Sequence, residues 1–314
     1  MIYDWDMVGH REQLAQLERE IQTDNVTHAY LFAGPPQIGK FRMAVTMASI
    51  LQCPKNFCRT CKNCKLIPAG THPDTILLRD NGESLKIDEV RDMIGRANLV
   101  AQAPYRIFVI ENIERMPLEA QNSFLKTLEE PPGKTMFILT TSRLTDVLPT
   151  IVSRVRSYYF FNVGSETLKT FLKKEFANRG DLDEIVNMAQ GRPGLAISLM
   201  KDTNLLTEQR ELYGKIDLFL KRNNLAEKFL FVATLVDEDS DSSGPMDTFF
   251  DAYTRYLRKL LFEYMEQDAH PLRERFDLGG LVRLFESLEK TRYLIRKNAN
   301  KRLALENLFI TTEK

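Results

Sequence analysis

The sequence predicts an α/β domain built on a five-stranded parallel sheet, followed by two helical domains. Two patterns carry this expectation, and the first is an alternation of short apolar runs with longer amphipathic stretches in the first half of the chain. That order is typical of strands and helices in a parallel sheet. Each run is almost continuously apolar, as strands buried on both faces are. The expected strands are 29–33, 75–78, 107–110, 137–140 and 157–161.

The second pattern is the loss of strand signals after about residue 162. Ser165 is a capping residue type and predicts a helix that runs toward residue 178. A second helix is expected to end at Gly191, and Pro193 is expected to open a third in its first turn. From about residue 204 the chain has the pattern of amphipathic helices, except for a polar segment at 237–245 that is expected to be a loop.

Composition excludes several classes of protein. Of 314 residues, 43% are hydrophobic and 27% are charged, which is typical of a globular protein. The 43 basic side chains equal the 43 acidic ones, so the chain is not expected to hold DNA alone. No apolar run approaches the ~20 residues that cross a bilayer, and the first residues lack the pattern of a signal peptide. The expected location is therefore cytoplasmic.

A phosphate-binding loop is predicted between the first expected strand and the helix after it. Residues 34–40 read Gly-Pro-Pro-Gln-Ile-Gly-Lys, which is the GxxxxGK pattern in the context it requires. Gly34 and Gly39 let backbone amides turn toward phosphate oxygens, and Lys40 supplies a positive charge. The next position should carry a hydroxyl that ligates Mg²⁺, but Phe41 has no oxygen to offer. The loop is therefore expected to be a degenerate nucleotide site.

The strand at 107–110 gives the second half of this site. Such a strand normally ends in an Asp that serves the magnesium shell, followed by a Glu that polarises the attacking water. Here the two positions are Glu111, whose carboxylate is one methylene too far out, and Asn112, which cannot take a proton. Two losses in the two halves of one site indicate that hydrolysis has been abandoned.

All four cysteines of the chain lie between residues 53 and 64: Cys53, Cys58, Cys61 and Cys64. Four thiols within reach of one centre, in a reducing compartment, predict a structural Zn²⁺ site rather than disulfides. A catalytic zinc would keep an open position, which four cysteines do not leave. His72 is an alternative ligand, although a histidine in a turn is the simpler interpretation.

Together these features resemble the AAA+ clamp-loader subunits of bacterial DNA polymerase III. A zinc module between the P-loop helix and the second strand is unusual among P-loop proteins and typical of these subunits. Further matching segments are Thr71-His72-Pro73-Asp74, Ile87-Asp88-Glu89-Val90-Arg91, 122–132, Ser153-Arg154-Val155 and 298–306. The resemblance implies an AAA+ domain at 1–162 with its zinc module at 53–64, a helical lid domain at 163–204 and an oligomerising collar at 205–314.

Within this family the chain resembles the delta-prime type more than the gamma/tau type. The degenerate residues of the nucleotide site favour delta-prime, as does the small-residue segment at 191–196. Arg192 within that segment points the other way, because it could act as a sensor of nucleotide.

The resemblance implies a scaffold with little ATPase activity that completes a hetero-oligomeric loader ring. The implied partners are the gamma/tau and delta subunits, with the sliding clamp and primed DNA reached through the complex during DNA replication. Arg154 is expected to act in trans on the ATP of a neighbouring subunit, and binding of ATP and Mg²⁺ by this chain is doubtful. Two alternatives stay open: a working gamma-like ATPase, and an unrelated zinc-containing module that binds nucleic acid.

Overall fold

The computed structural model describes residues 2–81, 87–176, 180–221, 224–238, 244–266 and 276–311. The chain forms two compact units, Met1–Ile197 and Ser198–Lys314. The finer division into domains at 1–162, 163–204 and 205–314 stays a prediction. None of the described helices combines the length and the apolarity that a membrane span requires.

The first unit contains a five-stranded sheet in which every neighbouring pair is parallel. The strand order is β2-β3-β4-β1-β5. The strands are β1 Ala29–Ala33, β2 Thr75–Leu78, β3 Arg106–Ile110, β4 Thr135–Thr141 and β5 Arg156–Tyr159. All five predicted strands are therefore confirmed, and the fifth begins and ends slightly earlier than expected.

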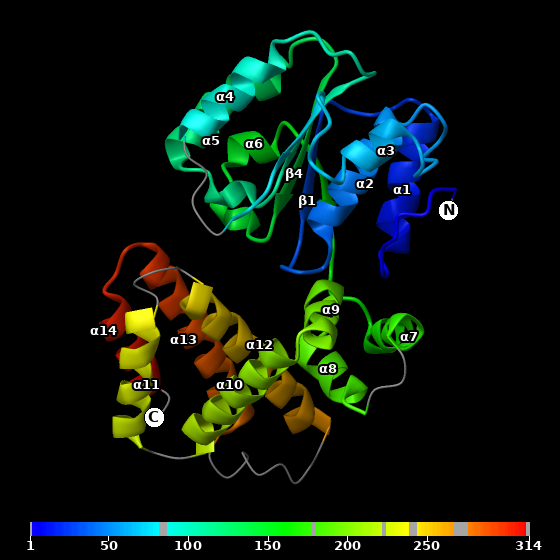
Figure 1. Ribbon diagram of the computed structural model, residues 1–314. Coiled ribbons are helices and arrows are strands. Elements are labelled where there is room, and N and C mark those ends of the chain that lie inside the picture. Colours follow the sequence, from blue (N-terminus) through cyan, green and yellow to red (C-terminus); the bar gives the residue numbers. More distant parts are fainter. Residues whose placement is uncertain are drawn as a thin grey trace. The chain divides into compact units, whose positions relative to one another are not determined.

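Helices cover both faces of this sheet, as Figure 1 shows. Tyr30 and Phe32 of β1 point into a core shared with α1 and α2, whereas Leu31 points into a core shared with α4, α5 and α6. The alternation explains why the strands are apolar without interruption. The helices are α1 Arg11–Gln22, α2 Lys40–Gln52, α3 Lys62–Leu66, α4 Ile87–Ala97, α5 Leu118–Glu129 and α6 Pro149–Val152.

Three further helices follow the sheet: α7 Ser165–Glu175, α8 Leu182–Ala189 and α9 Pro193–Lys201. Pro193 opens α9, as predicted. The expectation for Ser165 is wrong, because Gly164 occupies the N-cap position and no side chain caps the helix. α7 also stops at Glu175, where the extended backbone of Phe176 ends it before residue 178.

The described part of the second unit contains helices and no strand: α10 Thr203–Lys221, α11 Leu225–Glu238, α12 Gly244–Glu266, α13 Leu278–Arg296 and α14 Lys301–Thr311. Aromatic rings join several of them, since Phe249 lies 5.5 Å from Phe231 and 6.4 Å from Phe309 between ring centroids. The predicted loop at 237–245 is too long, because α11 continues to Glu238 and α12 begins at Gly244. The rest of that segment lies outside the described residues.

Candidate nucleotide site and cysteine centre

The predicted phosphate loop lies at the carboxyl edge of the sheet, between β1 and α2. Gly39 caps α2 with φ of 98°, a conformation that residues with a Cβ rarely adopt. A Cβ on Gly34 would lie 2.3 Å from the carbonyl oxygen of Phe160, so the chain approaches too closely there for a side chain. Both glycines are therefore required by the geometry of the loop.

Lys40 is buried and turns back onto its own loop. Its Nζ donates to the carbonyl oxygens of Gly34 at 2.8 Å and Pro35 at 2.7 Å, and to Ser142 Oγ at 3.1 Å. Burial lowers the pKa of Lys40 to about 8, although the carboxylates of Glu114 and Glu111 favour its charged form. The lysine that should meet phosphate thus has three acceptors within the protein.

The end of β3 holds the two other substituted positions. Glu111 Oε2 accepts a hydrogen bond from the Asp80 amide at 3.1 Å, and burial raises the pKa of Glu111. The Asn112 backbone is left-handed, with φ of 50°, and its Nδ2 donates to Asp80 Oδ2 at 2.6 Å. Asn112 Oδ1 lies 3.3 Å from Ser142 Oγ. Both side chains are hydrogen-bonded within the protein, and Asn112 has no carboxylate to act as a base.

Phe41 has a packing role, and its side chain carries no atom that could bind a metal. Its half-buried ring packs against the core between the sheet and α2, and Arg79 Cζ stacks over it at 5.3 Å from the ring centroid. The ring lines a separate cavity on the outer side of α2. The ring of Phe41 therefore contacts both the protein core and Arg79.

The start of α9 closes directly on the phosphate loop. The Gly194 amide donates to the Gln37 carbonyl oxygen at 2.8 Å, and a Cβ on Gly194 would come within 2.6 Å of that oxygen. Arg192 is buried, and its positive charge lowers the pKa of Lys40, so the two cations lie near each other. Arg192 thus lies near Lys40, and its possible role as a nucleotide sensor stays a prediction.

Two residues of this site were not found from the sequence. Ser142 follows β4 and contacts both Lys40 and Asn112. Glu114 Oε1 accepts from the Ser142 amide at 2.8 Å, and among the described residues its buried Oε2 has no hydrogen-bond partner. Their positions in the sequence could have indicated them, because residues that follow a buried parallel strand lie at the carboxyl edge of the sheet, where ligands bind.

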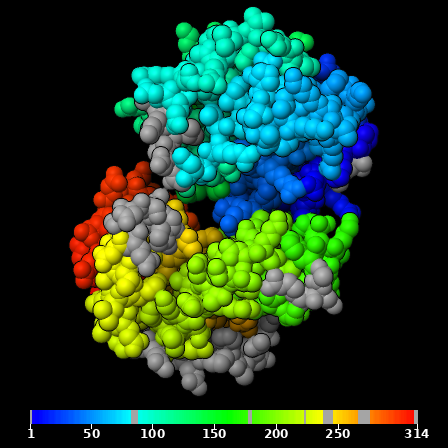
Figure 2. Space-filling view, in the orientation of Figure 1, coloured from blue at the N-terminus to red at the C-terminus, as the bar shows by residue number. Residues whose placement is uncertain are grey.

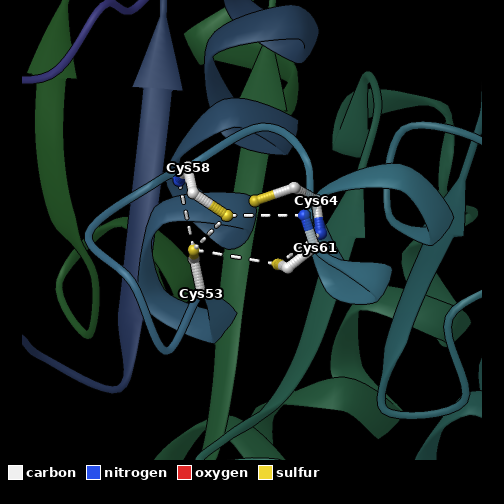
Figure 3. A group of neighbouring side chains, drawn as sticks. All are labelled: Cys53, Cys58, Cys61 and Cys64. Carbon is white, nitrogen blue, oxygen red and sulfur yellow. Dashed lines mark hydrogen bonds between the residues drawn. The ribbon is translucent and has the colours of Figure 1, made fainter.

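The four cysteines converge on one point from the loop after α2 and from α3, as Figure 3 shows. Their sulfur atoms all lie within 4.8 Å of one another. Cys53 Sγ is 3.7 Å from Cys58 Sγ and 3.9 Å from Cys61 Sγ. Four sulfurs at about 2.3 Å from a tetrahedral Zn²⁺ would be about 3.8 Å apart. The arrangement fits a metal ion of this kind.

Backbone amides of the cysteine loop point at its sulfurs. The amide of Cys58 donates to Cys53 Sγ at 3.3 Å, and that of Cys61 to Cys58 Sγ at 3.4 Å. The hydrogen bonds from Thr60 lower the pKa of Cys58 to about 6. His72 lies outside the cluster, where its Nδ1 accepts from the Asp74 amide at 3.2 Å. The group that could hold a metal is therefore the four cysteines.

Arg154 lies on the surface, in the turn between α6 and β5. Its Nε donates to Glu129 Oε1 at 2.7 Å and its Nη1 to the Thr150 carbonyl oxygen at 2.9 Å. About a third of the side chain, 36%, is exposed. Arg156 has a different environment, because it pairs with Glu20 at 2.7 Å, and Glu20 also accepts from buried tyrosines.

The first half of the chain is similar in sequence to known proteins. Residues 9–163 match the protein family described as "DNA polymerase III, delta subunit". Over 157 residues the chain is 37% identical to the DNA polymerase III subunit delta' of Pseudomonas aeruginosa, a match that covers 48% of this chain and 44% of that protein. This part of the chain is delta-prime-like.

The delta-prime-like region also matches gamma/tau proteins. The chain is 30% identical over 206 residues to the DNA polymerase III subunit tau of Bacillus subtilis, covering 62% of this chain and 36% of that protein. The matches span less than half the length of either relative. The structure of a RuvB variant from Thermotoga maritima superposes with a TM-score of 0.53 at 14% identity, covering 84% of this chain and 96% of that one. At that identity the likeness shows a shared fold and no more.

Proposed function

We propose that this chain is a delta-prime-like subunit of a replicative clamp loader, a scaffold that hydrolyses little or no ATP itself. In this role it completes the loader ring with gamma/tau and delta subunits. The ring then places the sliding clamp on primed DNA during DNA replication. The delta-prime and tau relatives support the assignment to this machinery.

The observation that carries the scaffold role is the state of the nucleotide site. Phe41 brings no hydroxyl for Mg²⁺, and the amide of Asn112 is bonded to Asp80. Phosphoryl transfer depends on positioned metal and charge, and both are compromised here. ATP and Mg²⁺ are therefore not assigned as working cofactors of this chain.

A catalytically active gamma-like subunit is the second candidate. The buried Arg192 near Lys40 favours it, because a sensor arginine would occupy such a place. The two candidates differ in one measurement, which is ATP turnover by the isolated chain.

Arg154 is proposed as the group that acts on a neighbouring subunit. Its guanidinium is exposed at the surface, and Glu129 and the Thr150 carbonyl oxygen hold it in a fixed orientation. An arginine offered in trans can neutralise the charge that develops on the γ-phosphate of the neighbour. The pair with Glu129 must loosen or be shared when this happens. Since the pair is partly exposed, breaking it costs little.

Zinc is proposed as the ion of the cysteine centre, in a structural role. Four cysteine ligands fill a tetrahedral shell and leave no position for substrate. The loop between α2 and α3 has little regular structure, so the metal would supply its rigidity.

The proposed function is tested by reconstituting the loader from this chain and the gamma/tau and delta subunits of its own organism. Arg154→Ala should leave assembly intact and lower the ATPase activity that clamp and primed DNA stimulate. The affected neighbour site should lose roughly a thousandfold in rate, as in well-studied arginine fingers. Arg154→Lys should restore little, because an ammonium cannot reproduce the planar fork.

Arg96→Ala is the matched control, because Arg96 also makes an exposed ion pair, with Asp92. It should leave assembly and ATPase activity unchanged. Failure of the chain to join gamma/tau and delta subunits would reject the clamp-loader role. Normal clamp loading by an assembled Arg154→Ala complex would reject the role in trans alone.

A further inference from the structure

A cavity of about 440 Å³ lies on the outer side of α2, between the N-terminal segment and the cysteine loop. Its apolar floor includes Phe41 and Val45 of α2 and Phe57 of the cysteine loop. In the space-filling view the dark blue N-terminal segment lies beside the light blue surface of that loop (Figure 2). An apolar cavity of roughly 150 Å³ holds a benzene ring in a well-studied case, so this one has room for an aromatic side chain.

Three arginines are among the residues that line the cavity: Arg42, Arg59 and Arg79. Two of them already hold carboxylates of the chain itself. Arg42 pairs with Asp6, and Arg59 pairs with Asp4 at 3.1 Å while also donating to the Asp4 carbonyl oxygen at 2.6 Å. The N-terminal segment thus shows which chemistry these arginines accept: the carboxylates of a peptide segment.

Arg79, the third arginine, makes no ion pair with the described N-terminal segment. Arg79 stacks on Phe41 and donates to the Pro68 carbonyl oxygen at 3.2 Å. Among the described residues, no carboxylate forms an ion pair with it. Its exposed guanidinium therefore keeps donors available directly beside an aromatic-lined cavity.

We propose that this cavity binds a peptide segment of a partner protein in which an aromatic side chain is flanked by acidic residues. The aromatic ring fills the space over Val45, and a neighbouring carboxylate pairs with Arg79. The exposed rim lets the peptide backbone lie across the surface while one side chain enters. This inference does not depend on the proposed role in a clamp loader.

The charges of the rim favour a peptide over a nucleic acid. Asp4 and Asp6 pair with two of the three arginines, so only the charge of Arg79 is not matched by an aspartate of this segment. Nucleic-acid binding draws its affinity from several uncompensated cations along a phosphate backbone. A single carboxylate needs only Arg79, and the two aspartates would repel a longer run of phosphates.

The proposal is tested by titration calorimetry on the full chain. The probe is a heptapeptide with blocked ends and the sequence Gly-Ser-Asp-Phe-Asp-Ser-Gly. It should bind measurably, whereas the peptide with Asn in place of both Asp, and the one with Ser in place of Phe, should each bind roughly tenfold more weakly or not at all. Equal binding of all three peptides, or binding of none, would overturn the proposal.

Variants of the protein locate the site. Arg79→Gln should weaken binding of the heptapeptide roughly tenfold. Thr46→Trp, which fills the cavity from α2, should abolish binding. Arg91→Gln, at an exposed position on α4, should change nothing. Because Arg79 is exposed, its variant should melt like the unmodified chain. Displacement of the peptide by an oligothymidine strand, or unchanged binding to Arg79→Gln, would refute the peptide assignment.

Discussion

At the scale of single residues, Lys40 links the degenerate site to the stability of the fold. Burial lowers its pKa from the ordinary value of 10.5 to about 8. Between these two values the unfolded chain binds a proton that the folded chain has lost. The free energy of unfolding therefore rises with pH through this group. Tyr30 and Tyr158 act in the opposite sense at higher pH, since burial raises the pKa of both.

The test is the pH dependence of urea unfolding, followed by the fluorescence of Trp5, the single tryptophan, which is buried in the first unit. From about pH 7.5 to about pH 9.5, the chain should gain about 1–2 kcal/mol of unfolding free energy relative to Lys40→Met. The exposed Lys126→Met serves as control and should run parallel to the unmodified chain. A difference between the chain and Lys40→Met that stays constant over this range would contradict the lowered pKa.

At the scale of elements, the contact between α9 and the phosphate loop depends on one missing side chain. Gly194→Ala would place a Cβ 2.6 Å from the Gln37 carbonyl oxygen, an approach that backbone atoms cannot accept without moving. We expect a loss of about 1–3 kcal/mol in the free energy of unfolding of the first unit, measured with the same tryptophan signal.

Gly95→Ala is the matched control for this change. Gly95 lies within α4, and a Cβ there would meet nothing within 4 Å. The variant should be more stable by about 0.4–1 kcal/mol, because alanine loses less backbone entropy in a helix. If both variants behaved alike, the close contact of α9 would have no energetic weight.

The cysteine loop is the second element that a single substitution can test, because we propose that a bound metal orders it. Cys61→Ser should release the metal and loosen residues 53–64, because Cys61 is one of four ligands and its sulfur also caps α3 by accepting from the Cys64 amide. Metal analysis of never-chelated protein should give about one Zn²⁺ per chain before the change and a small fraction of that after it. Lys62→Ser, beside the ligand, should keep its metal. Unmodified protein without zinc would contradict the assignment.

How far each element could be predicted depends on whether its cause is local. The strands were predictable because burial on both faces makes them continuously apolar. The cluster of cysteines was predictable because all four lie within twelve residues of the sequence. The contact of Lys40 with Ser142 joins residues 102 positions apart, so no local sequence pattern predicts it. Nor did the sequence indicate that the ring of Phe41 would line a cavity outside the phosphate loop. Charged residues near 237–245 suggested a loop, yet helix ends exposed to water tolerate them.

At the scale of the whole molecule, the phosphate loop lies where its motif predicts it, between β1 and α2, and the loss of its hydrolytic chemistry stays a proposal. Gly39 and Lys40 begin α2 as the motif requires, whereas Phe41 offers no hydroxyl and the amide of Asn112 is bonded to Asp80. A fold of this kind can present surfaces to neighbouring subunits without cycling nucleotide. Turnover and assembly should therefore separate experimentally.

The purified chain should hydrolyse ATP at the background rate, in the presence and in the absence of Mg²⁺. Lys40→Ala should not change that rate, because a site without a positioned metal and base gives the lysine no transition state to stabilise. Release of inorganic phosphate at high protein concentration is the measurement, and a preparation of Lys40→Ala made in parallel controls for contaminating ATPases. A magnesium-dependent rate that disappears in Lys40→Ala would belong to this site. It would mean that Glu111 can serve the metal despite its buried carboxyl, and that the gamma-like alternative describes the chain better.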